Sequence, residues 1–300
     1  MLSRRRFIGS TSAAATLLAI GVRRAMANPL GLPLGLQLYS VREMLAKDYT
    51  GTLRQLGALG YQEVEAAGFF GRTPSQVKTA MNSAGLSCVS AHYPAFELGK
   101  SADEIISYCR DLGSKYVICS FPGIKDPLRL KDKSFRTIVQ SFTMDDYRWN
   151  ADQFNLWGRK VKTAGMQFGY HNHTMEFASI NGVTPMKELF RLTNPDLVTF
   201  ELDCGWVTVG GGDPVAYLQD YPKRISMLHI KDFKAISQPA SILDPPPAAE
   251  LGQGTVDFHA IYRAAKGGNI RHAFIEQEAY DMPPLQALRI DADYIKALQV

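Results

Sequence analysis

Two histidines stand two positions apart in the segment QFGYHNHTMEF, residues 167–177. If this segment is a β-strand, His171 and His173 point to the same face, because side chains alternate along a strand. Two imidazoles on one face can bind a metal ion, act as a base and the group that orients it, or pack in a core. The choice depends on which other polar side chains the fold brings to the same place.

Other ionisable residues occupy the last positions of other apolar, strand-like runs. These residues are Glu63, Glu65, His92, Glu201, Asp203, His229, Lys231, Glu276 and Glu278, with Gln37 and Tyr39 in the first run. Burying this many ionisable groups at one end of a fold is costly unless they bind something. Imidazole and carboxylate without thiolate form a ligand set for Zn²⁺, Mn²⁺, Co²⁺ or Fe²⁺ and not for Ca²⁺.

The elements that must position these residues alternate between apolar runs and amphipathic helical patterns. The runs cover residues 34–39, 61–66, 86–92, 116–120, 166–173, 198–203, 225–231 and 272–278. Eight such units in about 270 residues predict an α/β fold with a single (β/α)8 TIM barrel, whose strand ends carry the active site. The first run is not followed by G-x-G-x-x-G, which argues against a doubly wound dinucleotide-binding sheet.

Local signals predict helix starts and loops. Thr73 and Asp213 each precede a proline, a combination typical of an N-cap followed by the first helical residue. Ser101 and the glutamate three residues later predict a capping box at a helix start. The two longest connections, 122–150 and 233–255, follow the fourth and seventh strands and are expected to be partly ordered flaps over the site.

Residues 1–27 have the features of a twin-arginine signal peptide: SRRRFI at 3–8, a short apolar run, and AMA at 25–27 as a cleavage site. We therefore expect a periplasmic protein, with no membrane anchor after cleavage, in which residues 28–300 form the barrel domain. Removing five arginines and no acid changes the net charge from +4 to +4 − 5 = −1. This charge, without a basic run, argues against a nucleic-acid partner.

The four cysteines show no motif typical of a redox or metal site. Cys88, Cys109, Cys119 and Cys204 form no C-x-x-C pair and lie in or beside apolar runs. They are expected to be buried free thiols.

Seven motifs, in this order, resemble the xylose isomerase-like TIM barrel superfamily, in particular its sugar phosphate isomerase/epimerase group. They are GLQLYSVRE, GYQEVEAAGFFG, YHNHTMEF, ELDCGW, MLHIKDF, LGQGTVDF and FIEQE. The resemblance implies one divalent metal ion held at the ends of strands 5 to 8, and three of its ligands match Asp203, His229 and Glu276. Many members of the family have a Glu-Asn pair at the end of strand 5. Aligning its asparagine with Asn172 places His171 at the position of the glutamate, the fourth ligand. The inosose dehydratase-like branch has a similar histidine-rich fifth strand, so this branch and its lyase relatives are nearer than xylose isomerase.

The resemblance also implies roles in proton transfer. Glu276 is expected to be a base as well as a ligand, and His173 a second acid or base nearer the barrel mouth. Lys231 is expected to stabilise an enediolate or to protonate a leaving group. A metal-bound imidazole at His171 is a poor proton acceptor, which argues against epimerisation by two metal-bound glutamates. The spacing leaves open which of the two histidines is the ligand.

The expected reaction is proton abstraction next to a carbonyl, with one divalent ion (Mn, Zn, Co or Fe) as Lewis acid. The enediolate is then reprotonated, giving isomerisation or epimerisation, or expels a substituent in dehydration or glycoside elimination; the residues do not choose between these. Export favours a free sugar, keto-sugar or glycoside over a sugar phosphate as substrate. A metal-dependent hydrolase or endonuclease and a non-catalytic sugar-binding protein are the competing classes.

Four further residues are candidate substrate contacts. Glu65 can bind sugar hydroxyls or be a surface carboxylate, and His92 can bind substrate or pack in the core. Trp206 is expected to form an apolar wall against a sugar ring, and Tyr39 either adds to this wall or packs. A homo-oligomer is compatible with the sequence but not indicated by it.

Overall fold

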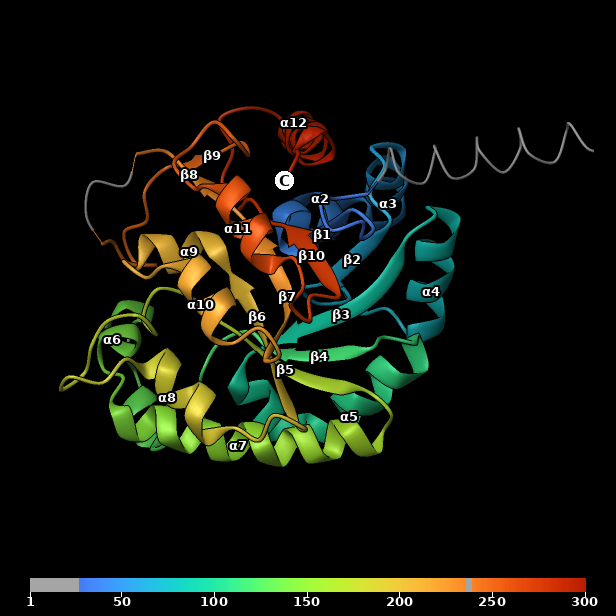
Figure 1. The fold of residues 1–300 in the computed structure, drawn as a ribbon. Helices are drawn as coiled ribbons and strands as arrows, with labels where there is room; N and C mark the ends of the chain where they lie inside the picture. The colour runs from blue at the N-terminus through green and yellow to red at the C-terminus, as the bar shows by residue number, and fades with distance from the viewer. Residues whose placement is uncertain (1–26, 236–238) are drawn as a thin grey trace, which may run out of the picture.

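The computed structural model describes residues 27–235 and 239–300. Eight parallel strands close into a barrel in the order β1-β10-β7-β6-β5-β4-β3-β2 (Figure 1). They are β1 (Gly35–Gln37), β2 (Glu63–Ala66), β3 (Ser87–Tyr93), β4 (Tyr116–Cys119), β5 (Gln167–His171), β6 (Val198–Asp203), β7 (Ile225–Ile230) and β10 (His272–Ile275). Each overlaps one predicted run, so the predicted (β/α)8 barrel is confirmed. The predicted signal peptide, apart from its last residue, lies outside the described residues.

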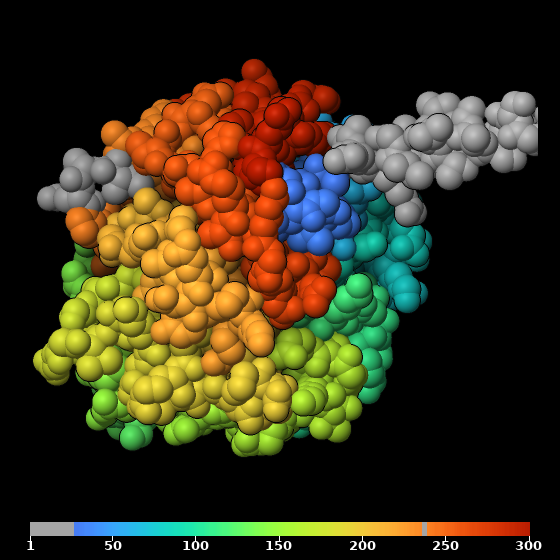
Figure 2. All heavy atoms as spheres, in the orientation of Figure 1, coloured from blue at the N-terminus to red at the C-terminus, as the bar shows by residue number. Residues whose placement is uncertain are grey.

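Helices surround the barrel (Figure 1). They are η2 (Leu38–Val41), α2 (Arg42–Lys47), α3 (Tyr49–Ala58), α4 (Pro74–Ser83), α5 (Ala95–Leu112), η3 (Pro127–Leu130), α6 (Phe135–Gln140), α7 (Met144–Thr163), α8 (Pro185–Leu192), α9 (Cys204–Val209), α10 (Pro214–Asp220), α11 (Phe258–Ala265) and α12 (Pro284–Ala297). Early and late parts of the described chain meet on the surface in Figure 2, because β1 pairs with β10. None of the described helices has the length and apolar character needed to cross a bilayer.

Two of the three predicted helix starts are observed. Thr73 and Gln76 form a capping box at α4, and the Asp213 side chain accepts a hydrogen bond from a backbone N–H at the start of α10. The predicted start at Ser101 is observed in part: α5 already begins at Ala95, but Ser101 has a non-helical backbone (φ −141°, ψ 36°) at a kink where two helical segments join. Residues 95–100 form the additional helical segment before this kink, which the sequence signal did not indicate.

The lower part of the barrel interior is apolar. Val89, Ile118, Met227 and Phe274 form a buried cluster from strands on different sides of the ring, so the cluster fills the inside of the barrel. Phe274 pairs in register with His229 on the neighbouring strand. The polar residues of the strand ends therefore begin directly above this apolar cluster. The four cysteines are free thiols, three of them buried and Cys88 half-buried.

The second flap is fixed to the barrel by one carboxylate. After β7, the short strand β8 (Asp232–Phe233) pairs antiparallel with β9 (Ala248–Ala249). The buried side chain of Asp232 accepts five backbone N–H hydrogen bonds of 2.9–3.1 Å. The donors are Phe233, Gly252, Gly254, Thr255 and Val256. A Cβ on Gly254 would come within 2.2 Å of the carboxylate, which explains a glycine in the LGQG motif.

Asp232→Asn is expected to lower the free energy of unfolding by about 1–3 kcal/mol, because an amide nitrogen would then face backbone N–H donors and leave them unpaired. Urea unfolding measures this loss. Asp152→Asn, an exposed aspartate on α7, is the matched control and should change stability little. Equal stability of the two variants would show that the carboxylate does not hold the flap.

Candidate active site

Polar side chains from different strands meet at the C-terminal end of the barrel, in two layers. In the lower layer His92 Nε2 lies 2.7 Å from Glu65 Oε1 and 2.7 Å from Glu201 Oε2. His229 Nε2 lies 2.8 Å from the same Glu65 oxygen and 3.2 Å from Glu201 Oε2. Burial alone would lower the pKa of His92, but the two carboxylates raise it to about 9. The pKa of His229 is likewise raised, by Glu201, Glu276 and Glu65 against the effect of burial.

The upper layer centres on the ammonium group of Lys231. Its Nζ lies 2.7 Å from Glu276 Oε2 and 3.5 Å from Asp203 Oδ2, and it also contacts Glu278. Burial would lower the pKa of Lys231, yet these three carboxylates raise it above its usual range, so the side chain is a cation. The ring of Trp206 lies beneath this cation, with Nζ 4.5 Å from the ring centroid.

The two histidines of the YHNH segment are neutral. Burial, followed by the neighbouring His229, lowers the pKa of His171 to about 4. Burial, followed by His171 and Lys231, lowers the pKa of His173 well below its usual value. His171 Nδ1 lies 3.2 Å from Glu201 Oε2, whereas His173 Nδ1 is buried and makes no hydrogen bond with any described residue. Both imidazoles therefore keep a lone pair for a metal ion or a proton.

The predicted ligand set comes together in space. One potential ligand atom from each of His171, Asp203, His229 and Glu276 lies within 4.8 Å of the others. Asp203 Oδ2 is buried without a hydrogen bond from the described residues, and the ammonium of Lys231 lies 3.5 Å away, so this oxygen can still accept a metal ion. His229 Nδ1 faces Glu276 Oε2 at 3.2 Å while its Nε2 is held by Glu65. This carboxylate–imidazole pair leaves Nδ1 oriented for a metal, so the donor set fits Zn²⁺, Mn²⁺, Co²⁺ or Fe²⁺.

A second grouping shares two of these residues. His92, His171, Glu201 and His229 also present ligand atoms within 4.8 Å of one another. In this lower group Glu201 contacts all three imidazoles. Burial would raise the pKa of Glu201, but these histidines hold it well below its usual range. The contacts favour Glu201 as the carboxylate that orients the rings.

The four residues predicted to contact substrate differ in how deeply they are buried. Glu65 is fully buried, and its oxygens contact Gln37, Ser90, His92 and His229. Its contact with substrate stays a prediction, and its surroundings favour an orienting role. His92 and Tyr39 line the pocket above the site. Trp206 is 3% exposed and packs against Phe233 and Lys231. Its role as a wall for a sugar ring also stays a prediction.

The pocket has a volume of about 550 Å³ and extends beyond the predicted residues. Phe121 after β4, Phe135 on α6 and Ile242 in the second flap also line it. The long connections indicated flaps in the sequence, but apolar side chains in a loop carry no signal of which ones face the site. Glu278, recognised only as a strand-end carboxylate, also lines this pocket.

The comparisons with known proteins agree with this architecture. Residues 53–298 match the sequence profile of the xylose isomerase-like TIM barrel family. The chain belongs to this family. The resemblance to it predicted from the motifs is thus confirmed.

The chain is similar to the following three proteins, among others. Inosose dehydratase of Geobacillus kaustophilus is 26% identical over 193 residues, 61% of this chain and 61% of that enzyme. The match thus spans about three fifths of that relative's length. A sugar phosphate isomerase/epimerase of Parabacteroides distasonis is 27% identical with a TM-score of 0.69, covering 87% of this chain and 96% of that one. The IolI protein, whose structure holds a zinc atom, shares the fold at 15% identity and a TM-score of 0.67, covering 87% and 98%.

His171→Ala is expected to lose the bound divalent metal, while His173→Ala keeps it. We expect the affinity to fall about 100-fold or more for His171→Ala, because losing even an outer partner of a ligand costs about 10–100-fold. Metal analysis of the purified variants measures this difference. His259→Ala, an exposed histidine on α11, is the control and should bind metal normally. Normal metal content in both the His171 and His173 variants would contradict the assignment.

Proposed function

We propose that the protein is a divalent-metal-dependent carbohydrate isomerase or epimerase. It removes the proton next to the carbonyl group of a free sugar, keto-sugar or glycoside. The observation that carries this proposal is the neutral imidazole of His173, with an unbonded, buried Nδ1, in a pocket that His171 and Glu276 of the metal-ligand set also line. Membership of the xylose isomerase-like family and the likeness to a sugar phosphate isomerase/epimerase support it.

His171, Asp203, His229 and Glu276 would hold the metal ion. A bound divalent ion supplies Lewis acidity, which makes a C–H bond next to a carbonyl more acidic. The remaining chemistry belongs to the side chains around it.

His173 is the better of the two candidate bases. Its ring is neutral, and its buried Nδ1 makes no hydrogen bond with any described residue. Glu276 Oε2, by contrast, lies 2.7 Å from Lys231 Nζ and 3.2 Å from His229 Nδ1. This oxygen of Glu276 is thus already engaged by cationic partners, whereas His173 Nδ1 is not. We therefore assign proton abstraction to His173 and ligand binding to Glu276.

Lys231 stabilises the negative charge that develops on the substrate oxygen. It is a buried cation held between three carboxylates. Its ammonium group is therefore already in position and does not have to move when negative charge forms on the substrate oxygen. His173 follows β5 and Lys231 follows β7, and these two strands are separated only by β6, so the two groups come from neighbouring parts of the barrel mouth.

Elimination is the second candidate function, as a dehydratase or a glycoside lyase. Its support is the likeness to inosose dehydratase and the contact between Lys231 and Glu278, which lines the pocket. A protonated lysine next to a pocket carboxylate can donate a proton to a leaving oxygen. A hydrolase or endonuclease and a plain sugar-binding protein stay the less favoured readings.

The test incubates a keto-sugar or a 3-keto-glycoside with the metal-loaded protein in D2O and monitors proton exchange by NMR. Deuterium at the carbon next to the carbonyl without elimination supports isomerase chemistry, and loss of the substituent supports the lyase. We expect His173→Ala to slow either process by about 100-fold or more, because general bases contribute about 10²–10⁴ in rate. His259→Ala serves as the control. If none of these substrates undergoes either exchange or elimination, the proposal is overturned.

We further propose that the protein reaches the periplasm through the twin-arginine signal in residues 1–27. Replacing Arg4 and Arg5 together by lysine should keep the protein inside the cell, because the paired arginines are the signal that the export machinery reads. Cell fractionation and immunoblotting measure its location. The same replacement at Arg23 and Arg24 is the matched control and should still be exported. Equal export of both variants would refute this route.

A further inference from the structure

The pocket has two chemically different ends. Its buried lining includes the imidazole of His171 and the carboxylate of Glu276, whereas its less buried lining is mostly apolar, with Glu97 as a charged exception. The apolar residues of this outer end are Tyr39, Pro94, Phe121, Phe135 and Ile242. Small-molecule pockets of ~300–1,000 Å³ enclose drug-sized ligands, and this one has about 550 Å³. One sugar ring at the polar end would leave the apolar end unfilled.

A row of rings leads from the proposed base to the outer edge of the pocket. The ring centroids of His173 and Phe121 lie 5.8 Å apart, and those of Phe121 and Phe135 lie 5.6 Å apart. Phe135 is 53% exposed although it is a large apolar side chain. An exposed aromatic residue beside a concave surface is typical of a ligand contact.

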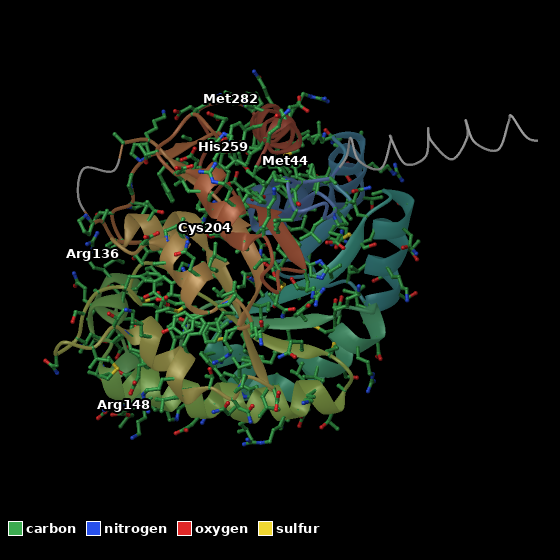
Figure 3. The ribbon with its side chains drawn as sticks, in the orientation of Figure 1. Met44, Arg136, Arg148, Cys204, His259 and Met282 are labelled. Atoms are coloured by element: carbon green, nitrogen blue, oxygen red, sulfur yellow. The ribbon has the colours of Figure 1, made fainter. Side chains whose placement is uncertain are left out.

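The two flaps are joined to each other above this outer end. Arg136, next to Phe135, makes two hydrogen bonds of 2.9 Å with the carboxylate of Asp244. Figure 3 shows Arg136 at the side of the molecule where α6 meets the segment after β8. In the same flap the N–H of Ile242 donates to Thr174 Oγ1 at 2.9 Å, one residue after His173. Phe135 and Ile242 are therefore positioned on opposite flaps around one opening.

The ion pair between the flaps is a weak connection. The side chains of Arg136 and Asp244 are 52% and 73% exposed, and water screens such pairs.

We propose that the outer end, formed by Phe121, Phe135 and Ile242, is a subsite for a second ring attached to the reacting sugar. The substrate class is then a glycoside, and this inference rests on the proposed function of the inner site. The second ring presents an apolar face to the phenylalanines. An aryl group and the C–H face of a second sugar share this chemistry.

The experiment measures the binding of unreactive ligands, so it does not depend on turnover. Isothermal titration calorimetry compares methyl β-D-glucoside, phenyl β-D-glucoside and cellobiose with the full metal-loaded protein. We expect at least one ring-bearing ligand to bind roughly tenfold more tightly than the methyl glucoside, the scale of one aromatic contact. Preference for the phenyl glucoside identifies an aryl leaving group, and preference for cellobiose identifies a second sugar.

Phe135→Ala should bring this affinity ratio close to one. Phe96→Ala is the matched control: Phe96 is 69% exposed on α5 and does not line the pocket. No preference for a ring-bearing ligand, including no measurable binding, or an unchanged ratio in Phe135→Ala would overturn the subsite. A preserved ratio together with no proton exchange in D2O would refute the proposed reaction and leave the subsite standing.

Discussion

The balance of charge at the mouth of the barrel is the constraint on which the rest of the structure depends. Glu65, Glu201, Asp203 and Glu276 are all buried, and isolated carboxylates in such surroundings would be strongly destabilising. Their partners are the raised-pKa imidazoles below and the ammonium of Lys231 above. Because each of these positive charges meets two or more carboxylates, removing any one of them would weaken the compensation of several buried negative charges at once.

The same balance links metal binding to protons. Metal ligands must be deprotonated, so a divalent ion arriving between Asp203, His229 and Glu276 would displace a proton from His229. Glu65 holds the other nitrogen of that ring, and Glu201 contacts His171 in the same manner. The lower layer thus fixes the direction of the ligands, while the upper layer presents charge to the pocket. His173 belongs to neither network, which is why it is available for proton transfer.

The rigid barrel and its flaps have separate tasks. Strand ends supply the charged residues, whereas the connections after β4 and β7 supply the apolar side chains around the opening. The Asp232 carboxylate ties the second connection to the barrel through five backbone bonds, so the flap begins from a fixed base. An exposed ion pair joins the two flaps at their far ends. The firm attachment thus lies near the barrel, and the weaker, exposed link lies at the edge of the pocket.

The strand periodicity and the residue types at the strand ends were enough to predict the barrel and the gathering of polar residues at its mouth. These features follow from alternation along a strand and from the common direction of parallel strands. The choice of Asp203, His229 and Glu276 as one ligand set, with His171 among them, was what the family resemblance implied. The start of α5 and the depth of Glu65 could not be predicted, nor could the neutral state of His173. The depth of Glu65 and the state of His173 depend on neighbours far away in the chain, such as Glu65 and His229, which are 164 positions apart. Burial and pKa are properties of such assembled surroundings, and so only the tertiary structure decides which polar residues orient, which bind and which react.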